Sequence, residues 1–431
     1  MRLAWRTGIG CVVAYSVAVS CAAQTALTWP EVRARFQAIN PTLQADRIGI
    51  DELRASEITA FLRPNPQFST AWDQIGRTEL DDGTAGGIFA ASNPMITASY
   101  LHERQQKREL RRDSAQGATS IAVSTHADLE RTLLFTLRSA FVQVLQSKAY
   151  VSLAQTNLTA YDQTLALSRE RLQAGDIAQV DLDRLQLQRV TYESDLQTAQ
   201  VNLRIARIQL LRLLDDRMTP ADQFDVTGPY DFTPLATTLE DARQMALDTR
   251  PDLKAAAAAI EKARIDHRLA VANGSTDPVF SADAAFPGVS QAWLGYNPPL
   301  KEYVGVGITV PLRVFDRNQG EKLKTELDIT RTEKLEDAAR LQVFADVDTA
   351  YATVASTASL LEPYRDRYLD QATRVRDTVT FSYQNGGASL LDFMQAQQEY
   401  RAVQLSYVNL IAAFLNAVNQ LNLAIGREVF P

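Results

Sequence analysis

Four charged residues near the C-terminal end of the chain have the type and spacing to act on ions. Asp366, Asp370, Arg374 and Asp377 follow one another at helical spacing, one to three turns apart, shortly before the glycine pair Gly386–Gly387. Carboxylates that form a ring around a pore favour cations. These residues are therefore candidates for an ion gate if several copies of the chain surround one axis. A solvated helix face is the alternative interpretation of each single residue.

The other residue types that do chemistry are scattered. His102, His126 and His267 have no partners at the spacing of metal ligands, and no nucleophile–base pair, phosphate-binding loop or dinucleotide fingerprint occurs. We therefore expect no enzyme activity, no cofactor and no metal site within one chain. The net charge of −7, without runs of Lys or Arg, also disfavours nucleic-acid binding.

The first residues have the pattern of a secretory signal peptide. Two arginines precede an apolar run at residues 8–19, and Ser20-Cys21-Ala22-Ala23 follows, which predicts removal of residues 1–23. Alternatively, Ala18-Val19-Ser20-Cys21 loosely matches a lipoprotein box, and Cys21 would then remain as an acylated lipid anchor. Beyond residue 23 no apolar stretch approaches ~20 residues, so no helix of the mature chain is expected to span a bilayer.

The elements that must position the candidate residues are built twice. After Gly175 and again after Gly386, apolar residues recur at spacings of four and three. A shift of 211 residues places Leu203 on Phe414 and Leu210 on Leu421. A period of 3.5 indicates long helices that pack along a sustained seam. The sequence therefore predicts a tandem duplication, with residues 24–227 as the first repeat and 228–431 as the second.

Each repeat is expected to contain the same helices in the same order. An opening helix runs from Thr28 to about Leu62 in the first repeat and begins at Thr238 in the second, each with a capping residue. A helix of ~70 residues and ~100 Å follows, and a closing helix of about half that length comes after a glycine turn. The irregular segment 215–237 would join the two repeats at mid-height. The predicted long helices are 102–172 and 316–384, and their glycine turns are 171–176 and 383–388.

Between the opening and the long helix the hydrophobic period changes to two, which predicts β-hairpins at residues 66–101 and 278–312. The clearest strand is Tyr303–Leu312, where Val304, Val306 and Ile308 alternate with small or polar residues. Four segments with one apolar face match transmembrane β-strands. A half-buried strand pair in a soluble sandwich is the alternative. Two isolated hairpins 200 residues apart would make a poor soluble sheet, so we favour the membrane.

Four strands cannot close a barrel, and lipid does not tolerate their open edges. Three copies supply twelve strands and a ring of helical columns. The expected fold is therefore mainly α with a small β part: duplicated long-helix units form a periplasmic α-helical barrel, and four strands per chain close a 12-stranded β-barrel in a trimer. Such an assembly would be a hollow export duct through the bacterial outer membrane.

This order of elements, together with Asn40-Pro41, Arg250-Pro251 and the tip glycines, resembles the TolC-type outer-membrane efflux family over nearly the whole mature chain. Two segments are similar to its heavy-metal (CzcC-like) branch: GITVPLRVFDRNQGE at residues 307–321 and SYLHERQQKRELRR at residues 99–112. The second has Gln105-Gln106 where that branch tends to carry glycines.

The resemblance implies a passive homotrimer that meets a periplasmic adaptor and an inner-membrane pump of the resistance–nodulation–division type, and it favours heavy-metal cations as cargo. A multidrug or type I protein-export duct of the same fold is the alternative within transport, and a periplasmic coiled-coil scaffold without a pore is the alternative outside it. The resemblance further implies closure of the tip by charged rings at the gate candidates. It places adaptor docking at residues that otherwise serve as helix-ending turns: Arg171, Leu172, Gly175, Asp176, Tyr383, Gly386 and Gly387.

Overall fold

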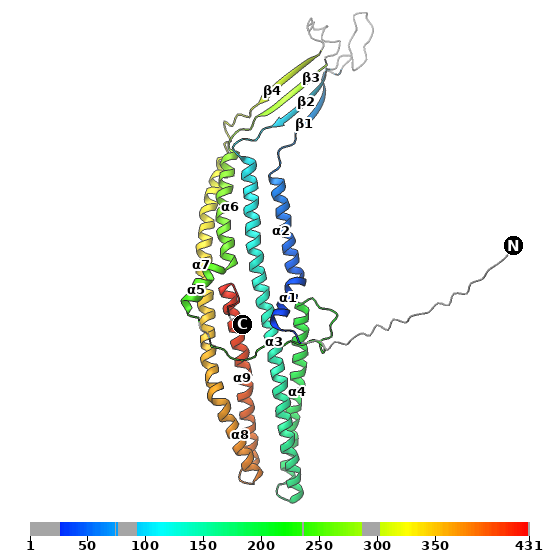
Figure 1. Ribbon diagram of the computed structural model, residues 1–431, viewed down its shortest axis with the longest axis vertical. Helices are drawn as coiled ribbons and strands as arrows, with labels where there is room; N and C mark the ends of the chain where they lie inside the picture. Colours follow the sequence, from blue (N-terminus) through cyan, green and yellow to red (C-terminus); the bar gives the residue numbers. More distant parts are fainter. Residues whose placement is uncertain (1–25, 74, 76–92, 235–236, 287–301, 430–431) are drawn as a thin grey trace, which may run out of the picture.

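The computed structural model describes residues 26–73, 75, 93–234, 237–286 and 302–429 of the 431-residue chain. The predicted signal peptide and the Cys21 anchor lie outside the described residues. Figure 1 shows an elongated molecule with a β-sheet at one pole and two helix turns at the other. The two distinct poles follow from the order of elements that the sequence predicts.

Each repeat contributes two short helices, a long helical column and a closing helix. The first repeat has α1 (Trp29–Ile39), α2 (Pro41–Ala60), α3 (Lys107–Ala174) and α4 (Gln179–Leu213). The second has α5 (Leu239–Thr249), α6 (Pro251–Asn273), α7 (Gln319–Pro363), the π-helical turn η2 (Tyr364–Tyr368), α8 (Leu369–Gln384) and α9 (Leu390–Ile425). The predicted repetition of elements is confirmed, whereas the repeat boundaries at 24–227 and 228–431 stay a prediction.

The opening helix of each repeat is broken, so the expectation of one helix from Thr28 to about Leu62 is wrong. α1 gives way to α2 at Asn40-Pro41, because proline has no N–H and disfavours helical backbone at the preceding residue. Asn40 has φ −58° and ψ 118°, and its side chain accepts a hydrogen bond from the Leu43 N–H. Arg250, before Pro251, has nearly the same backbone angles, φ −61° and ψ 124°. Both dipeptides are therefore junctions between helices.

The helices lie beside one another as their lengths predict. In Figure 1, α2 runs along the part of α3 nearer the sheet and α4 along the part nearer the turns, and α6 and α9 stand in the same way beside α7 and α8. The segment between α4 and α5 crosses at mid-height. Its Val226 forms a parallel bridge with Leu27, and its Phe232 packs edge-on against Phe414 with ring centroids 4.8 Å apart. This segment therefore joins the packing of the two repeats.

Most buried apolar side chains in the described part of the chain belong to three clusters. One belongs to the first repeat around Phe36 and Phe141, and a second belongs to the second repeat around Val347 and Phe414. A third, at the helical pole, combines residues of both repeats. The two mid-height cores contain residues of the 3.5-residue seam seen in the sequence, Leu210 in the first repeat and Phe414 and Leu421 in the second.

Helix α9 is the one described helix that is long and apolar enough to cross a membrane by length and composition. Half of its most apolar window is buried inside the chain, where α9 packs against α7 and α3. The expectation that no apolar stretch approaches ~20 residues is therefore wrong for α9. Its hydrophobicity fits the core helix of a bundle, since such a helix must cover two neighbours.

The strands β1 (Gln67–Asp73), β2 (Asn93–Leu101), β3 (Val279–Ala285) and β4 (Tyr303–Thr309) form one antiparallel sheet in the order β1-β2-β3-β4. The strand predictions are confirmed with small differences at the ends. β2 pairs with β3, so the hairpins of the two repeats join in a single sheet. The sequence did not indicate this pairing.

The register separates an apolar face of the sheet from a polar one, because directly paired residues lie on the same face. Apart from Thr70 and Tyr100, every described side chain on the first face is apolar, and Val304 and Val306 are 81% and 88% exposed. The opposite face carries the charged residues Asp73 and Asp283 together with several serines and threonines. We call these the outward and the inward face.

Candidate functional site at the helical pole and the mid-height junction

The two turns at the helical pole have the same construction. Gly175 has φ 86°, and the next N–H, of Asp176, donates to the carbonyl of Arg171 at 2.9 Å. Gly386 has φ 78°, and the next N–H, of Gly387, donates to the carbonyl of Ser382 at 2.8 Å. This closure of a helix end needs a left-handed residue, which glycine adopts without steric cost. The prediction of helix-ending turns is confirmed at both positions; Gly175 and Gly386 are the left-handed residues, and Gly387 follows one of them without positive φ.

One arginine connects the two turns. Arg171 donates from Nη1 to the carbonyl of Tyr383 at 2.8 Å, and its guanidinium lies 5.4 Å from the centre of the Tyr383 ring. The Tyr383 ring stacks on Phe393 at 4.9 Å and is only 5% exposed. Leu172 packs beside them as a half-buried residue. Of the predicted docking residues, Arg171, Leu172 and Tyr383 therefore hold the pole together, while Gly175, Asp176, Gly386 and Gly387 are exposed.

The four gate candidates are exposed on the helical column that approaches the second turn. Asp370 pairs with Arg374 at 2.6 Å, and both side chains are about two-thirds exposed, at 63% and 66%. Asp366 and Asp377 pair with arginines adjacent in sequence. The neighbouring guanidinium lowers the pKa of Asp366. Residues 370, 374 and 377 share one helix face by their spacing, so the structure brings these three together on one surface.

The column changes its winding just before these residues. Pro363 stands inside the helix and is followed by the π-helical turn η2, which contains Asp366. A proline cannot donate to the preceding turn, and a π-turn accommodates the missing hydrogen bond by adding a residue. Such turns in long helices are frequent at functional sites. The lone proline of the long helix, Pro363, is the sequence signal for this feature.

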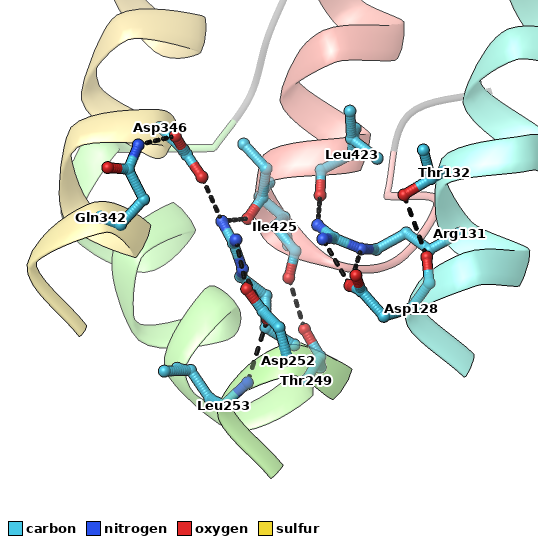
Figure 2. Close-up of polar contacts among 12 residues, drawn as sticks. Asp128, Arg131, Thr132, Thr249, Asp252, Leu253, Gln342, Asp346, Leu423 and Ile425 are labelled. Carbon is cyan, nitrogen blue, oxygen red and sulfur yellow. Dashed lines mark hydrogen bonds and ion pairs between the residues drawn. The ribbon is translucent and has the colours of Figure 1, made fainter. Parts of the chain in front are cut away.

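A buried polar junction that no sequence pattern indicated lies at mid-height, where α9 ends against the α5–α6 break (Figure 2). Arg250 is 5% exposed and bonds Asp252 at 2.6 Å, Asp346 at 2.8 Å and the Ala424 carbonyl at 3.3 Å. Thr249 donates to the carbonyl of Ile425 at 2.6 Å. Burial opposes the ionisation of Asp252, but the Arg250 guanidinium outweighs it, so the pKa of this carboxyl is lowered.

Arg131 of α3 completes the same junction from the other repeat. It pairs with Asp128 at 2.6 Å and donates to the carbonyl of Leu423, as Figure 2 shows. An α-helix leaves its last carbonyls without N–H partners. Side chains from α3, α5 and the α5–α6 break therefore satisfy three successive carbonyls at the end of α9. The junction is a connection between the repeats and holds no group poised for catalysis.

The histidines lie apart from one another. His126 Nδ1 is 2.6 Å from Asp46 Oδ2, His267 Nδ1 is 3.0 Å from Thr325 Oγ1, and the ring of His102 packs edge-on against Phe280. Among the residues that the structure describes, no group of three or more His, Cys, Asp or Glu is arranged to hold a metal ion.

Comparison with known proteins gives one family. Residues 242–427 match the family model of the outer membrane efflux proteins. The chain is 25% identical over 358 residues to the pyoverdine export outer membrane protein OpmQ of Pseudomonas aeruginosa, covering 81% of this chain and 72% of that protein. It is 22% identical over 369 residues to the cobalt-zinc-cadmium resistance protein CzcC of Cupriavidus metallidurans, covering 80% and 84%.

The fold is also found among solved structures. The outer membrane protein VceC of Vibrio cholerae superimposes with a TM-score of 0.71 at 15% sequence identity, covering 92% of this chain and 96% of that one. The mainly helical architecture with a small antiparallel sheet is therefore an established fold.

Proposed function

Because residues 242–427 match the family model of the outer membrane efflux proteins, we propose that the chain is a member of this family and that three copies form a passive exit duct for heavy-metal cations. The protein lies in the outer membrane, with its helices in the periplasm. The family is one of channels and not of enzymes. In the proposed assembly a periplasmic adaptor and an inner-membrane pump of the resistance–nodulation–division type deliver the cargo and supply the energy.

The observation that carries the proposal is the two-faced sheet. Its outward face is apolar and exposed, as lipid contact requires, and its inward face is polar. The edge strands β1 and β4 each have one free side in the described part of the chain. In a bilayer these edges must be paired. Pairing β4 of each copy with β1 of the next satisfies them, and three copies close twelve strands.

An exposed apolar stripe on α4 supports the same assembly. Its members follow one another at intervals of three, four, seven or eleven residues, and their exposure ranges from 46% to 72%: Val180, Leu187, Val190, Val201, Ile205 and Ile208. The opposite seam of α4 packs on α3 within the chain. A second apolar seam on a periplasmic helix indicates a second helical partner. We propose that a neighbouring copy supplies it.

The choice of cargo rests on charge and on one relative. The inward face of the sheet carries the carboxylates of Asp73 and Asp283 and no Lys or Arg within the described strands. Rings of carboxylates favour cations in a pore. The relative CzcC is named for resistance to cobalt, zinc and cadmium. The relative OpmQ is named for export of pyoverdine, so a duct for organic compounds or for proteins is the alternative.

We propose the helical pole as the adaptor site and the gate. The exposed residues Gly175, Asp176, Gly386 and Gly387 would touch the adaptor, while Arg171, Leu172 and Tyr383 keep the two turns at a fixed separation. The exposed pair of Asp370 and Arg374, together with Asp366 and Asp377, would repeat three times around the axis and narrow the tip.

Conductance of single molecules in planar bilayers tests the duct and the gate together. Asp370→Ala/Asp377→Ala is compared with wild type, and Asp328→Ala is the control, because Asp328 is an exposed carboxylate of α7 paired with Arg331. We expect small currents that grow in the double variant and not in the control. Equal currents in all three proteins would refute the gate. Failure of every protein to insert would refute the duct and favour a periplasmic scaffold.

Cargo is tested in the native host. Loss of the protein should raise the cellular content of cobalt, zinc or cadmium, measured by elemental mass spectrometry, and leave retention of an organic dye unchanged. The reverse result would assign the duct to organic compounds.

A further inference from the structure

A cleft of about 300 Å³ lies where the outward face of the sheet meets the helices. Its walls include Arg63, Tyr100, His102, Lys107 and Arg108. Tyr100 belongs to the outward face by its pairing with Phe280, and His102 packs against the same Phe280 ring. The cleft therefore lies at the periplasmic end of the outward face, where the sheet gives way to the helices.

The chain around this cleft is basic, although the whole protein has a net charge of −7. The four segments that connect the sheet to the helices, residues 61–66, 102–113, 274–278 and 311–324, contain ten Lys or Arg and six Asp or Glu. These four segments therefore carry a local excess of positive charge at the level where the sheet ends.

Internal ion pairs occupy the acidic groups of the cleft. Glu103 is held by Arg111 at 2.8 Å, and Glu109 by Arg108 at 2.9 Å. Lys107 is nearly buried and bonds Asp277, which lies just before β3, at 2.5 Å. Within the described ranges no ion pair reaches the exposed Arg63. The cleft therefore presents a cation without a counter-ion beside carboxylates that are already neutralised.

The apolar surface continues past the end of the sheet toward this level. Leu62 is 59% exposed, Phe68 71%, Leu312 82% and Phe315 92%. Exposed apolar side chains next to arginines mark the boundary between hydrocarbon and headgroups, where an arginine keeps its stem in the apolar layer and its charge in water.

We propose that the cleft binds the headgroup phosphate of an anionic phospholipid of the periplasmic leaflet, with Arg63 and Arg108 as its cationic contacts. The acyl chains would run along the outward face past Phe68 and Ala98, which are paired across β1 and β2. Phosphate accepts hydrogen bonds from the planar guanidinium in a fixed geometry. This inference depends on the position of the sheet in the membrane and is independent of the cargo of the duct.

Native mass spectrometry of the full-length protein tests the site. The protein is incubated in neutral detergent with equimolar phosphatidylglycerol and phosphatidylcholine, and the retained lipids are counted. We expect wild type to prefer phosphatidylglycerol by about fivefold, the ratio that one unpaired basic contact, Arg63, supplies at an anionic surface, because Arg108 already pairs with Glu109. Arg63→Gln should lose most of the preference and Arg63→Gln/Arg108→Gln all of it. Arg217→Gln, which changes an 85% exposed arginine of the mid-height segment, should keep it.

Three results would overturn the proposal: equal retention of both lipids by wild type, an unchanged preference in Arg63→Gln, or an equal loss in Arg217→Gln. A second experiment repeats the lipid incubation with inorganic phosphate in excess. Retention of phosphatidylglycerol in excess phosphate supports the lipid, whereas displacement assigns the cleft to free phosphate. Arg63 has no ion partner to lose, so its variant should elute like wild type from a sizing column. The single-channel conductance of Arg63→Gln shows whether the duct still forms. A failure of the lipid site is thereby distinguished from a failure of the duct.

Discussion

Replacement of Arg250 by asparagine should loosen the end of α9 without disturbing the start of α6. Asparagine is the residue at the matching position of the first repeat, Asn40, where its side chain caps α2. Asparagine is also a good N-cap residue, so α6 keeps its beginning in the variant. What the variant loses is the guanidinium that bonds Asp252, Asp346 and the Ala424 carbonyl.

The size of the effect follows from burial. Removing one partner of a buried ion pair costs about 3–5 kcal/mol. The Asp252 and Asp346 side chains are 32% and 33% exposed, so water recovers part of that loss. The hydrogen bond to the Ala424 carbonyl contributes about 1 kcal/mol. We therefore expect local opening to become easier by about 2–4 kcal/mol, which accelerates exchange roughly 30- to 1000-fold.

Amide hydrogen exchange measured by mass spectrometry on peptides from the end of α9 checks this expectation. Arg331→Asn is the control, because Arg331 forms an exposed pair with Asp328 on α7, and such pairs contribute little to stability. Peptides from the helical pole should exchange as in wild type in both variants. If peptides from the end of α9 exchange at the wild-type rate in Arg250→Asn, the end of α9 does not need the Arg250 guanidinium to stay closed. That result would refute the prediction.

Three further predictions concern other parts of the molecule. Burial of Asp216 opposes its ionisation, but hydrogen bonds from Thr219, two backbone N–H groups and Arg35 outweigh it and lower its pKa from the usual 3.8 to about 2. The ionised Asp216 carboxylate therefore contributes its full stabilisation of the fold above pH ~4, and this contribution is lost as the pH falls toward ~2. In thermal scans, Asp216→Asn should unfold at lower temperature than wild type at pH 7. Its unfolding temperature should also depend less on acid pH. Gln105→Gly should raise the stability by roughly 0.5–1 kcal/mol in the same scans, because Gln105 has φ 57°. Val306→Arg should reduce the fraction recovered in the outer membrane, because an arginine on the lipid face costs about 2–4 kcal/mol at mid-bilayer.

Each of these has a matched control. Asp222→Asn removes an exposed acid of the same segment and should leave the acid dependence unchanged. Gln105→Ala removes the side chain without relieving the backbone, so equal stability of the Ala and Gly variants would contradict the argument from φ. Ser69→Arg places the same charge on the inward face, and equal loss of both arginine variants from the membrane would contradict the assignment of the two faces.

The duplication, the long helices, the strands and the glycine turns could all be predicted from the sequence, because each depends on local pattern. The spacing from Leu203 to Leu210 and from Phe414 to Leu421 indicates a seam without any knowledge of the partner helix. Alternation from Val304 to Ile308 indicates a two-faced strand. Gly175 and Gly386 had to be left-handed, since few other residues close a helix that way.

The tertiary structure decided what no local pattern contains. The break at Asn40-Pro41 could have been a kink, and only the packing of α1 at mid-height shows two helices. The pairing of β2 with β3 and the bond from Arg171 to the Tyr383 carbonyl join residues that lie more than 170 positions apart. In the sequence Arg250 stands out only as part of the Arg250-Pro251 dipeptide, and nothing there indicates that its side chain is buried. It is buried because the end of α9 arrives at its position with unpaired carbonyls, and contacts of that kind depend on how distant segments pack and not on the residues beside them.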